Sequence, residues 1–132
     1  MTDDNLFNED DVIFSYTRKQ AIEDGVLIDL TPWAKETGFK IPVACTATVW
    51  HEWITPSEAT ESFGQSERGR AHDVLWMCYV AIKSARSGGD QLQFDVLFLG
   101  SDQRQHTVTL KAVCGPGDEG EPVLTIMLPH ED

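Results

Sequence analysis

The stretch that decides the fold reads Arg68-Gly-Arg-Ala-His-Asp-Val-Leu-Trp-Met-Cys-Tyr-Val-Ala-Ile-Lys-Ser-Ala-Arg-Ser87. Its apolar residues recur at intervals of three and four, which is the helical period. They are Ala71, Val74, Leu75, Cys78, Ile82 and Ala85, and Met77 and Ala81 widen the stripe. Arg86 places a cation in the last turn, and Gly88 suits the position just past the end. A helix of this length measures about 30 Å, at about 1.5 Å per residue, so a sheet can pack along all of it.

Three segments that follow this helix have the alternating pattern of half-buried strands. Apolar residues line one face of each segment, at 91–99, 106–114 and 122–128. Three such strands in sequence predict an antiparallel meander whose apolar face needs a cover. We therefore expect an α+β fold. A mostly antiparallel sheet, made of this C-terminal three-strand meander plus one or two N-terminal strands, packs against the long central helix and shorter helices.

The N-terminal half begins with a clear helix signal. Thr17 and Gln20 fit a capping box, and Gly25 is placed to end the short helix that follows, over 18–24. The segment 26–30 is rich in β-branched residues and predicts a strand.

Further helix signals follow along the chain. A cap at Thr31 with a proline after it predicts a helix that Gly38 ends. The segment 43–54 has apolar residues at spacings of four, three and four, so a helix is predicted there too. In 55–58, Thr55 is the predicted N-cap, with Pro and Glu in the first turn. The polar segment 60–69 is predicted to be a mobile loop or a frayed entry to the long helix.

Length and hydropathy bound the organisation of the chain. A chain of 132 residues is the usual size of one domain. We expect a flexible acidic tail over 1–10 and a single α+β domain over 11–132, with a short strand at 12–16. No window approaches about 18 uninterrupted apolar residues, and the N-terminus has no signal-peptide pattern, so a cytoplasmic protein without a membrane association is expected.

Charge is the one unusual bulk property. The chain has 22 Asp and Glu against 10 Lys and Arg, for a formal net charge of −12. Such a chain repels nucleic acid and anionic membranes, so direct nucleic-acid binding is not expected. The charge suits a protein partner with a basic surface. Solubility alone is the alternative explanation.

The sequence contains no motif of a known catalytic or metal site. Cys45, Cys78 and Cys114 lie in apolar runs and are interpreted as reduced thiols, and no Cys and His pair has the spacing of zinc ligands. Pairing Cys114 with His106, or Cys45 with His51, lacks a supporting motif for a nucleophile. No catalytic residue, cofactor or metal is therefore assigned.

One side of the central helix is the first candidate site. It carries His72, Asp73, Trp76, Tyr79 and Lys83. A catalytic interpretation makes His72 a general base, but His72 and Asp73 are adjacent, and adjacent residues on a helix do not face each other. The alternatives are packing of Trp76 and Tyr79 under the N-terminal segments, or a contact surface for a protein partner.

The loop 115–121 is the second candidate site. It contains glycines, a proline and the three carboxylates of Asp118, Glu119 and Glu121. A partner-docking tip or a cation site is one interpretation, although the spacing is not that of an EF-hand. A solvated hairpin loop is the other.

Three stretches carry a resemblance to a known family: Ser15–Leu30, Asp73–Met77 and Val108–Leu128. They resemble a family of small acidic bacterial proteins of unknown function, often found on plasmids and mobile elements. That resemblance covers most of the chain and implies no catalytic residue. It does imply a possible setting, because accessory proteins of mobile elements often blunt host defence and acidic ones can imitate nucleic acid.

Three functional hypotheses follow. The first is a non-catalytic interaction protein that binds a basic partner surface, in its sharpest form a nucleic-acid mimic or anti-defence inhibitor. The second is an accessory module that forms a homo-oligomer through the Trp76 and Tyr79 side of the helix. The third is a small enzyme with a pocket near His72 and Asp73.

Overall fold

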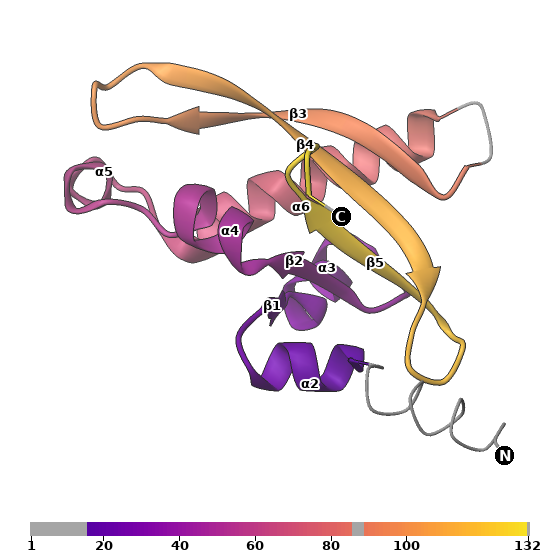
Figure 1. Ribbon diagram of the computed structural model, residues 1–132. Coiled ribbons are helices and arrows are strands. Elements are labelled where there is room, and N and C mark those ends of the chain that lie inside the picture. The colour runs from indigo at the N-terminus through magenta and orange to yellow at the C-terminus, as the bar shows by residue number, and fades with distance from the viewer. Residues whose placement is uncertain (1–15, 86–88, 132) are drawn as a thin grey trace, which may run out of the picture.

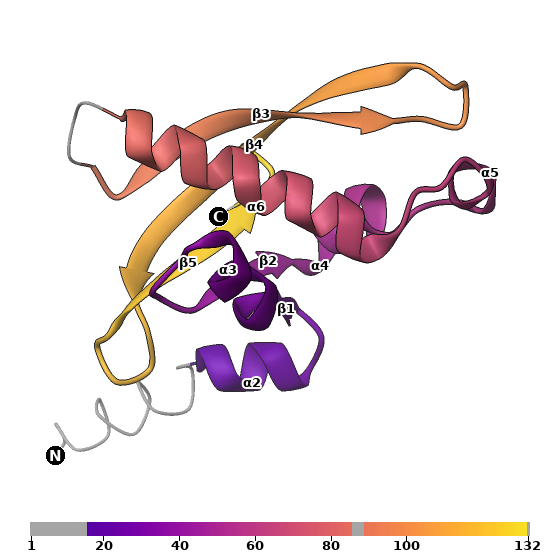
Figure 2. The same ribbon diagram turned by 180° about the vertical axis from the view of Figure 1, so that it is seen from behind.

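The longest helix crosses one face of a five-stranded sheet (Figures 1 and 2). The structure is a computed structural model that describes residues 16–85 and 89–131. The helices are α2 (Arg18–Glu23), α3 (Thr31–Thr37), α4 (Ala47–Val49), the π-helix η1 (Trp50–Ile54), α5 (Glu58–Ser62) and α6 (Glu67–Ser84). The strands are β1 (Leu27–Asp29), β2 (Val43–Thr46), β3 (Gln91–Leu99), β4 (Gln105–Pro116) and β5 (Pro122–Met127).

The sheet has the strand order β1-β2-β5-β4-β3. Strands β3, β4 and β5 form the predicted antiparallel meander, with Phe94 opposite Leu110 and Ala112 opposite Ile126. Strand β1 pairs antiparallel with β2, and β2 runs parallel to β5. The predicted α+β fold with a mostly antiparallel sheet is confirmed.

The core lies between α6 and the sheet. Helix α6 buries Ala71, Val74, Leu75 and Cys78 completely, as its apolar spacing predicts. The predicted stripe was too long and too wide, because Met77, Ile82 and Ala85 are exposed. The sheet contributes a row of buried side chains, namely Phe94, Val96, Phe98, Leu110 and Ile126. Each large side chain buried here stabilises the fold by about 1.5–3 kcal/mol, so this contact dominates the stability of the domain.

The ends of α6 differ slightly from the prediction. The helix starts at Glu67 because the Ser66 side chain accepts a hydrogen bond from the Gly69 amide at 3.0 Å. It ends at Ser84 with Ala85 as the C-cap. The predicted closing glycine, Gly88, lies outside the described residues.

The prediction of one helix over 43–54 was wrong in its first part. Val43, Ala44 and Cys45 are buried and form β2, between β1 and β5. A central strand that is covered on both faces has no alternating pattern, so its sequence does not distinguish it from a buried helix. The second part is helical, and the Thr46 side chain caps it.

Other N-terminal predictions are largely confirmed. Thr17 and Gln20 form the capping box of α2, and β1 occupies most of the predicted strand. Helix α3 begins at Thr31, which is its first residue rather than its N-cap; the Thr31 hydroxyl donates instead to Asp29 at 2.6 Å.

The segment between η1 and α6 is more ordered in secondary structure than predicted. Ser57, not Thr55, is the N-cap of α5, because its hydroxyl accepts from the Thr60 amide at 3.2 Å. The predicted loop over 60–69 therefore contains the end of α5 and the start of α6. The predicted tail over 1–10 and most of the predicted strand at 12–16 lie outside the described residues.

A membrane-spanning segment was not expected. Within residues 16–85 and 89–131, no helix combines the length and the apolar character needed to cross a bilayer.

Gly38 ends α3 as predicted and lies against the central helix. Its φ is 126°, and a Cβ built there would approach the Tyr79 ring to 3.2 Å. Gly25 also has a positive φ, 78°, but a Cβ there meets nothing within 4 Å. Substitution at Gly25 therefore introduces backbone strain alone, whereas substitution at Gly38 adds a close contact with Tyr79.

We predict that Gly38→Ala lowers the free energy of unfolding by about 2–3 kcal/mol, from backbone strain plus the Tyr79 contact. The control Gly25→Ala has the strain alone and should cost about 1 kcal/mol. Urea unfolding followed by circular dichroism measures both. Equal losses in the two variants would contradict the close contact between α3 and α6.

Candidate functional site

The predicted aromatic side of α6 is partly open. Trp76 is 48 % exposed and stacks on Tyr79 with ring centroids 6.0 Å apart. Tyr79 is half-buried, because Phe39 meets it edge-on at 5.5 Å. Lys83 places its Nζ 5.4 Å from the Tyr79 ring centroid. The structure therefore packs Tyr79 against the segment after α3 and leaves Trp76 at the surface.

His72 and Asp73 are both exposed on this side of α6. His72 lines a surface hollow of about 410 Å³, together with Trp33, Glu36, Ser66, Arg68 and Gly69. Asp73 does not line that hollow, and the carboxylate in it, Glu36, is paired with Arg68 at 2.9 Å. The structure thus places His72 in the same hollow as an ion pair, and Asp73 does not line that hollow.

Asp118 in the loop between β4 and β5 caps a distant helix. Its carboxylate oxygens accept hydrogen bonds from the Arg18 and Lys19 amides, at 2.7 and 3.0 Å. These are the first amides of α2, which have no partner within the helix. The two bonds lower the pKa of Asp118. Asp118 therefore holds α2 against the tip of the sheet.

The other two carboxylates of this tip differ from each other. Glu121 accepts a hydrogen bond from the Glu119 amide at 3.0 Å, within the turn. Glu119 itself is exposed. Of the three predicted partner-binding residues of this loop, Asp118 and Glu121 therefore have internal contacts that shape the loop.

A buried arginine, which no sequence pattern indicated, lies at the opposite end of the molecule. Arg70 is only 6 % exposed although it lies in the first turns of α6. Its guanidinium donates to the Trp53 carbonyl at 2.7 Å, to the Leu99 carbonyl, and to the Gln65 side chain at 3.2 Å. It also lies 5.4 Å from the Phe98 ring centroid. Burial lowers the pKa of Arg70, but a guanidinium stays charged at any physiological pH.

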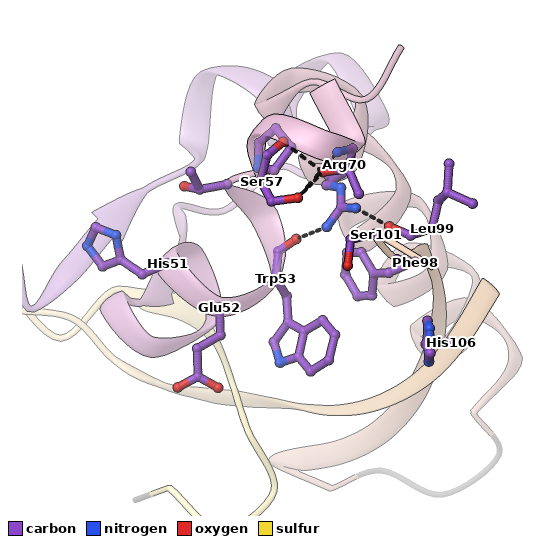
Figure 3. Close-up of a pocket in the computed structure, with 13 residues that line it drawn as sticks. His51, Glu52, Trp53, Ser57, Arg70, Phe98, Leu99, Ser101 and His106 are labelled. Carbon is purple, nitrogen blue, oxygen red and sulfur yellow. Dashed lines mark hydrogen bonds between the residues drawn. The ribbon is translucent and has the colours of Figure 1, made fainter. Parts of the chain in front are cut away.

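Arg70 is one of the residues that line a cavity of about 360 Å³ (Figure 3). The π-helix η1 supplies Trp53 to this cavity, and His51 and Glu52 lie at its border. His106 lines the other side, where Asp102 holds its Nε2 at 3.0 Å. The bonds of Arg70 tie the end of η1 to the end of β3, so its role in the described contacts is to join these two segments.

The end of the molecule around α5 is acidic. Residues 51–67 include Glu52, Glu58, Glu61 and Glu67, all of them exposed, and contain no Lys or Arg. The nearest cations along the chain are Arg68, which is paired with Glu36, and the buried Arg70. The segment 51–67, which we call the acidic end, therefore has an excess of negative charge. Figures 1 and 2 show α5 projecting there from the body of the domain.

Two of the three cysteines are buried thiols that are poorly suited to act as nucleophiles. All three thiols are free. Burial raises the pKa of Cys45 and of Cys78 to about 12, so both stay protonated at neutral pH. Among the residues that the structure describes, no three His, Cys, Asp or Glu side chains gather in a way that could hold a metal ion.

Arg70 yields a test of the contacts around it. We predict that Arg70→Met lowers the free energy of unfolding by about 2–4 kcal/mol, because the partly buried Trp53 and Leu99 carbonyls lose their donor. The matched control is Arg68→Met, which removes an exposed ion pair and should cost less than about 1 kcal/mol. Urea unfolding at neutral pH compares the two. Similar small losses would show that the guanidinium does not join η1 to β3.

Asp118 yields a pH-dependent test. Because its pKa is lowered in the folded state, its contribution is complete above the unfolded-state pKa of about 3.9. That contribution is lost as the pH falls through the folded-state pKa. We predict that Asp118→Ala lowers the urea midpoint at pH 7 and that this difference from the wild type shrinks in acid. Glu119→Ala, next to it, should leave the midpoint unchanged at both pH values.

Comparisons with known proteins give a family and no function. No curated protein and no solved structure matches the chain. A family model matches residues 3–132, which is nearly the whole sequence, and its description is a family of unknown function, DUF6573. The chain therefore belongs to the DUF6573 family.

Proposed function

We propose that this protein is a non-catalytic binding protein that holds a protein partner through a basic surface on that partner. The observation that carries the proposal is the acidic end. Four exposed glutamates lie within residues 51–67, and no Lys or Arg lies among them. Negative charge concentrated at one end attracts and orients a basic partner, whereas evenly spread charge serves solubility alone.

The arrangement of the glutamates supports this proposal. Glu58 and Glu61 lie in the single turn of α5, where carboxylates stabilise the helix. Phe63 follows them and is 40 % exposed, so an apolar anchor lies beside the charges. An exposed aromatic side chain within a charged surround is the usual composition of a protein interface.

The sharpest form of the proposal is a nucleic-acid mimic, as for an inhibitor carried by a mobile element. A basic groove that normally holds phosphates accepts an array of carboxylates at similar spacing. In this form the protein competes with nucleic acid for its partner. It does not bind nucleic acid itself, because like charges repel. The exposed Glu119 at the β4–β5 tip is a second place where such a partner can make contact.

We expect a Lys- and Arg-rich peptide to bind with an affinity that falls steeply between low and high salt. Glu58→Gln together with Glu61→Gln should weaken this binding by about threefold to tenfold, because each exposed charge pair is worth up to about 1 kcal/mol. The matched control is Glu23→Gln with Asp90→Asn, which removes the same charge from other exposed positions. Fluorescence anisotropy at two salt concentrations measures all three proteins.

The control decides between the proposal and solubility. If both double variants weaken binding equally, peptide binding depends on the net charge alone, and the acidic end has no special role. Glu119→Gln in the same assay tests the tip. A competition assay, in which the protein displaces DNA from a basic DNA-binding protein at low salt, tests the mimic form.

A further inference from the structure

The outer face of α6 is the main apolar surface that the described fold leaves uncovered. Eight large apolar side chains are exposed among the described residues, and α6 supplies four of them: Trp76, Met77, Val80 and Ile82. Trp76, Met77 and Val80 lie on the side opposite the buried stripe. Figure 2 shows α6 in front of the sheet, with no described element over the side turned to the viewer.

Trp76 is held in a fixed position on this face. Its ring stacks on Tyr79 at 18° between planes, and Tyr79 is itself fixed by Phe39. An aromatic side chain that is already held loses little conformational entropy when a partner covers it. Covering this face with a partner therefore costs little conformational entropy at Trp76.

The charges that flank this apolar patch are placed symmetrically. Asp73 and Lys83 lie on the same side of the helix as Trp76 and Val80, at successive spacings of three, four and three. Position 78 is the midpoint of both the Asp73–Lys83 pair and the Trp76–Val80 pair. The face thus has one negative end and one positive end around an apolar centre.

We infer that this face binds a second copy of the same chain, with the two α6 helices antiparallel. The twofold axis passes the outer face of α6 at the height of position 78 along the helix. Asp73 of each copy then lies opposite Lys83 of the other, and each Trp76 lies opposite Val80. Helix axes pack about 8–10 Å apart, which brings these side chains within reach. A parallel pair would place like charges opposite each other, so the charges select the antiparallel arrangement.

The symmetry makes this interface closed and modest in size. A twofold pair uses the same patch on both copies and does not grow into a filament. One helix face buries less than the standard interface of about 1,600 Å², so we expect a dissociation constant in the micromolar range. The interface does not use the acidic end, so this inference is independent of the proposed function.

The test is a charge swap in the full chain. Sedimentation velocity from about 1 μM to about 500 μM brackets a micromolar dissociation constant. We expect a monomer–dimer equilibrium for the wild type. Asp73→Lys alone, or Lys83→Asp alone, should weaken the dimer at least about tenfold, because each pair of opposite charges becomes a pair of like charges and the pair occurs twice. The double variant Asp73→Lys with Lys83→Asp should restore the dimer to within about threefold of the wild type.

Two further variants complete the experiment. Trp76→Ser should give a monomer with an unchanged circular dichroism spectrum, because the side chain is half exposed in the single chain. Glu23→Lys changes the charge as much as Asp73→Lys does but lies in α2, so it should dimerise like the wild type. A wild type that stays monomeric at the highest concentration, or a double variant that is no better than the single ones, would overturn the inference. Peptide binding by the acidic end is measured on the same proteins and should not change in the charge-conserving double variant.

Discussion

The contact between α6 and the meander of β3, β4 and β5 determines the rest of the molecule. Ala71, Val74, Leu75 and Cys78 are buried without remaining exposure, and they fix both the position and the rotation of α6. Once that rotation is fixed, the opposite side of the helix must face outward. The placement of Trp76 at the surface is therefore a consequence of core packing.

The same contact sets two surfaces of different chemistry. The segment of η1 and α5 comes directly before α6 in the chain. Arg70, in the first turns of α6, joins η1 to the end of β3. The glutamates of the acidic end lie before α6 or at its first residue, whereas the apolar patch lies further along the helix. A buried arginine bonded only to neutral acceptors is an expensive way to join two segments, because its charge is removed from water. Its three hydrogen bonds and the Phe98 ring offset that cost.

Local patterns in the sequence predicted the parts of the fold that rest on local physics. The spacing of apolar residues in α6, the alternation in the meander and the capping box at Thr17 each concern residues close along the chain. Strand β2 escaped prediction because both its faces are covered, which removes the alternation. The residues of the candidate site were predicted in part. The side of α6 with Trp76 was recognised, whereas the roles of Arg70 and Asp118 depend on partners about 29 and 100 residues away.

The parallel pairing of β2 with β5 has a consequence for the order in which the chain can fold. Cys45 pairs with Ile126, so one of the innermost seams of the sheet joins residues from the first half of the chain to the last strand described. During synthesis, β1 and β2 leave the ribosome early, and β2 has no second neighbour until β5 follows. One edge of β2 therefore stays unpaired while α6 and the meander are synthesised. Such an edge is a site where newly made chains pair with the wrong partner, and the acidic composition of the chain opposes that encounter by mutual repulsion.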